Sequence, residues 1–245
     1  MKHFDPNGPR VLKHPLQSRL FHWGLILGFM PAAITGFLIW LKPLNETLMN
    51  LAMQVHIVGA GILTISCVLY AVFCLDRVVA FIRLSFTWGK NDIEWMKVSG
   101  GYPQKMFLGK EIEVPPMDKV NSGQKIFGIC LLLGGTFLIV SGWLLYAFLP
   151  FAPKMLSFWM GFGHLYLGLF LGLFMFVHIF LGVYNWGEFK AMFGDGTQPL
   201  EEARHHNPLW VQNKIETVRG RGFSENIDED DDEEFDEESL EHNNI

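Results

Sequence analysis

The chain has 245 residues, of which 50% are hydrophobic and 18% are charged. Its apolar residues are gathered into four long runs, a distribution typical of membrane proteins and not of water-soluble domains. The formal charge of −6 arises at the C-terminus, where residues 225–241 hold 12 acidic residues, and the rest of the chain is basic. The three cysteines form no Cys-x-x-Cys pair, which argues against a disulfide framework and a zinc site.

The apolar runs predict an all-α membrane protein, a four-transmembrane-helix bundle. Each run reaches the about 20 residues that cross a hydrocarbon core, and none contains Asp, Glu or Arg. The first run is longer than the apolar part of a signal peptide and ends in "FLIWLKP", so we expect it to be retained. The expected spans are residues 20–41, 51–75, 126–149 and 158–185.

Lys and Arg predict the orientation of the spans. Only Lys42 and Lys154 lie in the two connections on one side, and the other 17 basic residues lie on the opposite side. Because cytoplasmic segments are rich in Lys and Arg, both termini should be cytoplasmic in a bacterial inner membrane. The expected organisation is a cytoplasmic segment (1–19), a transmembrane domain (20–185) with a cytoplasmic loop (76–125), a C-terminal segment (186–224) and an acidic disordered tail (225–245).

Four histidines lie inside these spans: His22, His56, His164 and His178. An ionisable group at membrane depth is costly unless it faces the bundle interior, so it marks a functional site by default. Alternating span directions place His22 and His178 near the inner face, and His56 and His164 near the outer face. A single membrane histidine can also serve only as a hydrogen-bonding group between helices.

The fourth span supplies one histidine at each depth. The 14 residues from His164 to His178 turn through about 1400°, close to four full turns, so the two side chains project from nearly the same face about 21 Å apart. One helix can therefore contribute to two stacked sites.

Paired histidines in a dry bundle favour haem over a bare metal ion. Zinc and copper sites usually need three or more protein ligands, whereas two axial histidines complete the coordination of a haem iron. No Cys-x-x-Cys-His motif is present, so the haems should be of the b type. Depth pairs His22 with His178 for an inner haem b and His56 with His164 for an outer one.

Three glycines, Gly128, Gly135 and Gly142, recur at intervals of seven in the third span. This spacing predicts a glycine stripe on one helix face. Close helix packing is the commoner use of such a stripe, and contact with a flat macrocycle is the alternative.

Five features together resemble the cytochrome b (gamma) subunits of membrane-bound respiratory formate dehydrogenases, and more widely those of nickel-iron hydrogenases. They are "RLFHW" at 19–23, His56 early in the second span, "NSGQK" at 121–125, the His164/His178 pair, and "EARHHNPLW" at 202–210. The likeness covers residues 14–212 and agrees in order along the chain.

The resemblance implies a four-helix diheme cytochrome with the pairings given above, and a quinone site beside the inner haem. In the family, the Asn-x-Gly-Gln motif and the neighbouring haem ligand line this site, which here implies Asn121, Gly123 and His178, with Gln124 as a weaker addition. An amide and free N–H groups at a helix start can hydrogen-bond a quinone carbonyl. The alternative for "NSGQK" is ordinary helix capping. Arg19, one turn before His22, is either a partner of a haem propionate or a positive-inside anchor.

The resemblance also implies a role in electron relay, with no catalytic residue for formate in this chain. An iron–sulfur subunit and a molybdenum or tungsten formate dehydrogenase subunit would lie at the outer surface, and menaquinone or ubiquinone would be reduced near the cytoplasm. No nucleic acid is expected as a partner. One alternative replaces formate dehydrogenase with a nickel-iron hydrogenase or a sulfur-compound reductase. Another is a haem-free membrane anchor or transporter, in which the histidines form a proton relay.

Overall fold

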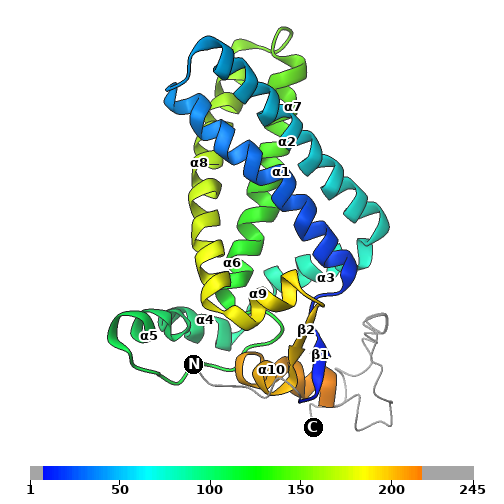
Figure 1. Cartoon of the computed structure of the whole chain (residues 1–245), viewed down its shortest axis with the longest axis vertical. Helices are drawn as coiled ribbons and strands as arrows, with labels where there is room; N and C mark the ends of the chain where they lie inside the picture. Colours follow the sequence, from blue (N-terminus) through cyan, green and yellow to red (C-terminus); the bar gives the residue numbers. More distant parts are fainter. Residues whose placement is uncertain (1–7, 217–245) are drawn as a thin grey trace, which may run out of the picture.

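Four helical spans run side by side through the computed structural model, which describes residues 8–216 (Figure 1). All four are long and apolar enough to cross a membrane, which confirms the predicted four-span helical fold. The acidic tail lies outside the described residues. The spans are α1 (Leu16–Leu41), α2 (Glu46–Phe73), the continuous run of α6 (Ser122–Cys130), η2 (Leu131–Gly135) and α7 (Thr136–Phe148), and α8 (Lys154–Tyr184).

Shorter elements gather at one end of the bundle (Figure 1). Two of them are strands that the sequence did not predict: β1 and β2 pair antiparallel, with Val11 opposite Gln198. The shorter elements are β1 (Arg10–Leu12), α3 (Leu75–Phe86), α4 (Lys90–Lys97), η1 (Ser99–Gly101), α5 (Tyr102–Leu108), α9 (Trp186–Phe193), β2 (Thr197–Pro199), α10 (Leu200–His206), α11 (Pro208–Trp210) and η3 (Val211–Glu216).

Each spanning helix begins about one turn before its apolar run. Two of these starts carry a side-chain cap: the Leu48 N–H donates to Oδ1 of Asn45 at 3.0 Å at the start of α2, and Oδ1 of Asn121 accepts from the Gln124 N–H at the start of α6. Such caps satisfy backbone N–H groups that have no partner within the helix. Apolar content alone therefore places the starts of these helices too late.

Small residues bring α1 and α2 into close contact. A Cβ on Gly28 would lie 2.5 Å from the backbone N of Leu63, and one on Gly59 would lie 2.8 Å from the Gly28 carbonyl oxygen. A Cβ on Gly24 would similarly meet the Ser66 hydroxyl. In lipid, where apolar side chains gain little by association, such close backbone packing is a main source of helix–helix affinity.

The third span contains a π turn at Leu131–Gly135, which includes Gly135 and lies between Gly128 and Gly142. A π turn holds one residue more than an α turn, so it rotates the following half of the helix relative to the first. A Cβ on Gly128 would meet α3, one on Gly142 would lie 3.0 Å from the His164 ring on α8, and one on Gly135 would meet nothing within 4 Å. The prediction of one glycine stripe is therefore wrong, whereas close packing holds at Gly128 and Gly142.

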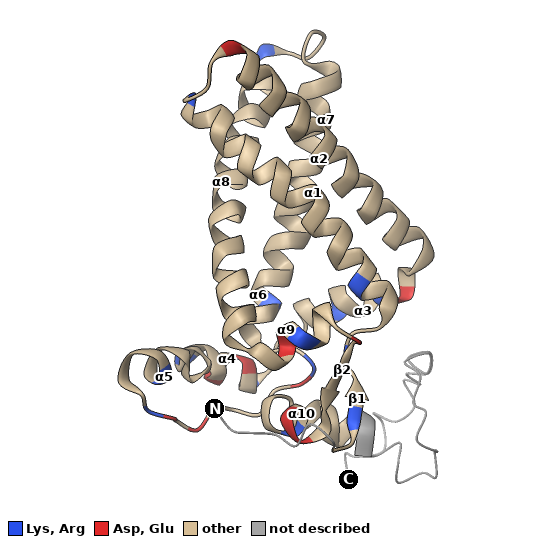
Figure 2. Cartoon of the chain, in the orientation of Figure 1, with Lys and Arg blue, Asp and Glu red and all other residues tan. Residues whose placement is uncertain are grey.

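Charged residues gather at the end of the bundle that carries α3, α4 and α9, and the spans are almost free of them (Figure 2). The opposite end carries Lys42, Glu46 and Lys154. The chain turns into α3 through a break at Cys74, whose backbone leaves the helical region with φ −137° and ψ 44°. We refer to the end of the bundle that carries α3, α4 and α9 as the charged end.

Candidate functional site

The four span histidines lie as two facing pairs on three helices. His22 of α1 faces His178 of α8 with ring centroids 6.4 Å apart, and His56 of α2 faces His164 of α8 with centroids 6.1 Å apart. Within each pair the depths match. His22 and His178 each lie six residues from the end of their helix that is nearest the charged end. His56 and His164 each lie ten residues from the end of their helix that is farthest from the charged end.

The separation within each pair fits a single iron bound from both sides. Two imidazoles that bind one metal ion through bonds of about 2 Å have ring centroids about 6 Å apart. Among the described residues, no three His, Cys, Asp or Glu side chains gather into a metal-binding group. The chain therefore offers two ligands per site, which is the number that a haem iron takes from a protein in bis-histidine coordination.

The His56/His164 pair is oriented by hydrogen bonds from its Nδ1 atoms. His56 Nδ1 lies 2.8 Å from the Ala32 carbonyl oxygen, which can only accept, so Nδ1 carries the proton. His164 Nδ1 lies 2.9 Å from Ser141 Oγ, whose own O–H donates to the Phe137 carbonyl at 2.6 Å. Both rings are thus in the tautomer that leaves Nε2 free to bind a metal.

Glycines make room for these two rings. A Cβ on Gly36 would lie 3.1 Å from the ring of His56, and a Cβ on Gly142 would lie 3.0 Å from the ring of His164. Each of these glycines directly follows a hydroxyl residue that contacts the same ring, Thr35 or Ser141. The sequence analysis missed this hydroxyl–glycine pattern, although both copies are readable as Thr-Gly and Ser-Gly within apolar spans.

The His22/His178 pair has a more apolar environment. Phe127 stacks on His178 with centroids 4.2 Å apart and planes 5° from parallel, and Phe193 of α9 approaches the edge of His22 at 5.4 Å. His22 Nδ1 is buried and has no hydrogen-bond partner among the described residues. The two pairs therefore differ in what their Nδ1 atoms contact.

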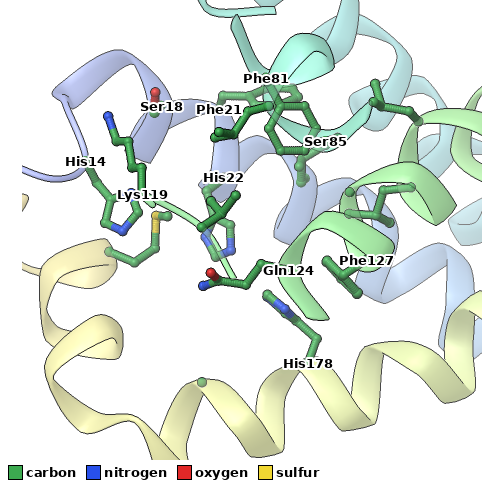
Figure 3. Close-up of a pocket in the computed structure, with 18 of the residues that line it drawn as sticks. His14, Ser18, Phe21, His22, Phe81, Ser85, Lys119, Gln124, Phe127 and His178 are labelled. Carbon is green, nitrogen blue, oxygen red and sulfur yellow. The ribbon is translucent and has the colours of Figure 1, made fainter. Parts of the chain in front are cut away.

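A cavity of about 3440 Å³ has His22 and His178 in its lining, together with His14 and Lys119 from the charged end (Figure 3). Its lining also includes Asn121, Gly123 and Gln124 of the "NSGQK" motif. Pockets that hold one drug-sized ligand measure about 300–1,000 Å³, so this space can hold more than one such group. His56 and His164 are not part of its lining.

The "NSGQK" motif caps α6. The Gln124 N–H donates to Oδ1 of Asn121 at 2.9 Å, and the Asn121 N–H donates to Oε1 of Gln124 at 2.8 Å, which is a reciprocal capping box. The cap uses only the oxygen of the Asn121 amide. Gly123 is tightly packed, because a Cβ there would lie 3.1 Å from the indole of Trp95.

A buried ion pair that the sequence analysis missed holds α4 on the start of α6. Lys125 Nζ lies 2.9 Å from Asp92 Oδ1 and donates to the Thr87 carbonyl at 2.8 Å, and Ser122 Oγ donates to Asp92 Oδ1 at 3.0 Å. Although burial opposes it, the hydrogen bonds from the Gly89 N–H and from Lys125 lower the pKa of Asp92. A lysine just before an apolar run was the sequence signal for this pair.

Arg19 reaches α9 at the charged end. Its Nη1 donates to the Gly194 carbonyl, and its Nε is buried without a hydrogen-bond partner in the described part of the chain. Arg19 is not among the residues that line the cavity of the His22/His178 pair, and its two expected roles stay predictions.

A second buried ion pair joins the two terminal segments. Lys13 Nζ donates to Glu188 Oε1 and, at 2.7 Å, to Asn207 Oδ1, and His14 Nε2 lies 3.8 Å from Glu188 Oε2. Burial lowers the pKa of Lys13. Burial also opposes ionisation of Glu188, but the hydrogen bond from His14 and the charge of Lys13 outweigh it and lower the pKa of Glu188 to about 2.

Comparison with known proteins gives two similarities. The prokaryotic cytochrome b561 family matches residues 13–195, which include all four span histidines. A formate dehydrogenase cytochrome b556 subunit of Haemophilus influenzae is 24% identical over 218 residues, which cover 85% of each chain. The family match spans most of the chain and agrees with its four apolar helices. The chain therefore belongs to the prokaryotic cytochrome b561 family of multi-pass, haem b-binding membrane proteins.

Proposed function

We propose that the chain is the membrane cytochrome b subunit of a respiratory oxidoreductase and holds two haem b groups. The observation that carries this proposal is the arrangement of the span histidines in two facing pairs at a separation that one iron can bridge. His22 and His178 would hold the inner haem, and His56 and His164 the outer haem. When bound, the haems supply one-electron transfer, and the chain's residues orient them and exclude water.

The distribution of charged residues supports one orientation of the chain in the membrane. The charged end holds most of the Lys and Arg residues of the chain, so we assign it to the cytoplasm together with both termini. Electrons would enter from an iron–sulfur subunit at the outer face and leave near the cytoplasm. Inward electron movement opposes a negative-inside potential at about 2.3 kcal/mol per charge per 100 mV, so the pathway would conserve energy.

The cavity beside the His22/His178 pair supports a quinone site. Asn121, Gly123, Gln124 and His178 line it, and the Asn121 amide nitrogen, which the capping box does not use, can donate to a quinone carbonyl. The same cavity reaches His14 and Glu188 at the charged end, which gives protons from the cytoplasm a route to a reduced quinone. The substrate would be menaquinone or ubiquinone.

The Haemophilus influenzae relative favours a formate dehydrogenase as the partner. The complete complex would then contain an iron–sulfur subunit and a molybdenum or tungsten catalytic subunit, and this chain would carry electrons without acting on formate itself.

The test is a reduced-minus-oxidised absorption spectrum of the purified chain and of His178→Ala. We expect a b-type α-band in the original chain and loss of the inner haem alone in the variant, because His178 belongs to one pair only. His205→Ala, a histidine outside the spans, is the matched control and should keep both haems. Absence of a b-type band would favour the haem-free anchor or transporter, and loss of both haems or of neither in His178→Ala would contradict the pairing.

A further inference from the structure

The two histidine pairs differ in the hydrogen bonds to their Nδ1 atoms. In the His56/His164 pair both Nδ1–H groups meet an acceptor, the Ala32 carbonyl at 2.8 Å and the Ser141 hydroxyl at 2.9 Å. Ser141 is fully buried, and its oxygen is fixed because its O–H is donated to the Phe137 carbonyl. In the other pair, the buried His22 Nδ1 has no partner among the described residues, and a ring face of His178 lies against Phe127.

This difference changes the ligands as electron donors. An acceptor at Nδ1–H draws the proton away from the ring and raises the basicity of Nε2, the atom that would bind iron. A more basic ligand stabilises ferric iron more than ferrous iron, because the ferric ion carries the larger positive charge. Hydrogen bonding to an axial ligand is therefore one of the means by which a protein lowers the potential of a haem.

We propose that Ser141, together with the Ala32 carbonyl, holds the outer haem at a lower midpoint potential than the inner haem. The inference rests on the proposed function, since it requires a haem at each pair. Ser141 is a positioning residue here: it acts through His164 and does not touch the iron. An electron that passes from the outer to the inner site oxidises one ferrous iron and reduces one ferric iron, so this internal step is favourable in the inward direction.

The test is a spectroelectrochemical titration of the b-type α-band in the intact complex, comparing the original chain with Ser141→Ala. The original chain should titrate as two one-electron components. In the variant we expect the lower-potential component to shift upward and the higher one to stay unchanged, because only His164 loses the hydrogen bond to the Ser141 hydroxyl. Ser66→Ala is the matched control: Ser66 also donates to a carbonyl one turn earlier in a span, that of Ile62 at 2.8 Å, but within residues 8–216 it has no hydrogen bond to a histidine. It should leave both components unchanged.

Ser141→Cys gives a second variant if the alanine variant does not retain its haem. Sulfur is a weak acceptor of similar shape, so the lower component should shift upward by less than in Ser141→Ala. Lack of any shift in the variant that retains both haems, or a shift of the higher-potential component, would overturn the role of Ser141 while leaving the diheme proposal intact. A single component from two haems per chain would overturn the inferred difference in potential, whereas fewer than two haems per chain would instead overturn the proposed function itself.

Discussion

The side chain of Asn121 uses one atom for helix capping and has another that is suited to the proposed quinone binding. Its Oδ1 caps α6 by accepting from the Gln124 N–H, and its amide nitrogen is left for the cavity that it lines. The two alternatives for "NSGQK", capping and quinone binding, therefore use different atoms of the same side chain and do not exclude each other.

The variant Asn121→Asp separates these two roles. Asp caps helices as well as Asn does, so α6 should keep its start, but the carboxylate cannot donate to a quinone carbonyl. Loss of one hydrogen bond of about 0.5–1.5 kcal/mol should raise the KM for quinone roughly two- to tenfold, with little change in the thermal midpoint. The measurement is steady-state quinone reduction by the intact complex. Asn121→Ser, which also keeps a cap and removes the amide, is the companion variant, and an unchanged KM in both would contradict quinone binding by this amide.

The helical elements near the cavity are joined by polar contacts that lie outside the lipid-spanning runs. The Asp92–Lys125 pair links α4 to α6 and is almost completely buried, with relative exposures of 6% for both residues. The indole of Trp95, also on α4, then packs on Gly123. One ion pair thereby holds α4 over the "NSGQK" motif.

Asp92→Asn should destabilise the packing of α4 on α6 by about 3–5 kcal/mol, because it leaves the Lys125 ammonium buried without an opposite charge. The double variant Asp92→Asn with Lys125→Met removes both charges and should recover most of this loss. Limited proteolysis of the 87–121 segment in the purified protein measures the effect as a change in cleavage rate. Equal cleavage of the single variant and the original chain would contradict a stabilising role, and failure of the double variant to recover would show that the charges are not the cause.

At the charged end, the segment before the first span contacts the segment after the last span. β1 pairs with β2, and the Lys13–Glu188 pair joins the segment before the first span to the segment after the last. The buried residues Leu200, Ala203, Trp210 and Val211 form a small apolar core behind the strands. Segments more than 170 residues apart in sequence thus hold the start of α1 and the end of α8 together at the charged end.

The stability of the contact between these two segments should fall at acid pH. The pKa of Glu188 is about 2 in the folded chain against 4.5 for an ordinary glutamate, so the unfolded segment binds more protons between these values. Its stabilising effect should be complete above pH 4.5 and decline as the pH falls toward 2. Hydrogen exchange of residues 197–212 measures the opening of the segment. In Glu188→Gln this pH dependence should disappear, and because both chains are compared at each pH, the intrinsic pH dependence of exchange cancels. An identical pH response in the two chains would contradict the role of Glu188.

The sequence by itself determined the four spans and the relative depth of their histidines. Both depend on properties that are local to one helix: apolar length against bilayer thickness, and the regular rise and rotation of the α-helix. The depth match between His22 and His178 and between His56 and His164 followed from these rules, and the same residues face each other in the structure.

Only the tertiary structure decided which groups surround those histidines. The π turn that separates Gly128 from Gly142, the β1–β2 pairing and the Asp92–Lys125 ion pair each depend on contacts between elements far apart in the chain. The hydrogen bond between Ser141 and His164 likewise depends on which face α7 presents to α8. Periodicity within one helix fixes which residues share a face, but packing among all helices sets the neighbour of that face, so a local signal such as Ser-Gly does not identify its partner on another helix.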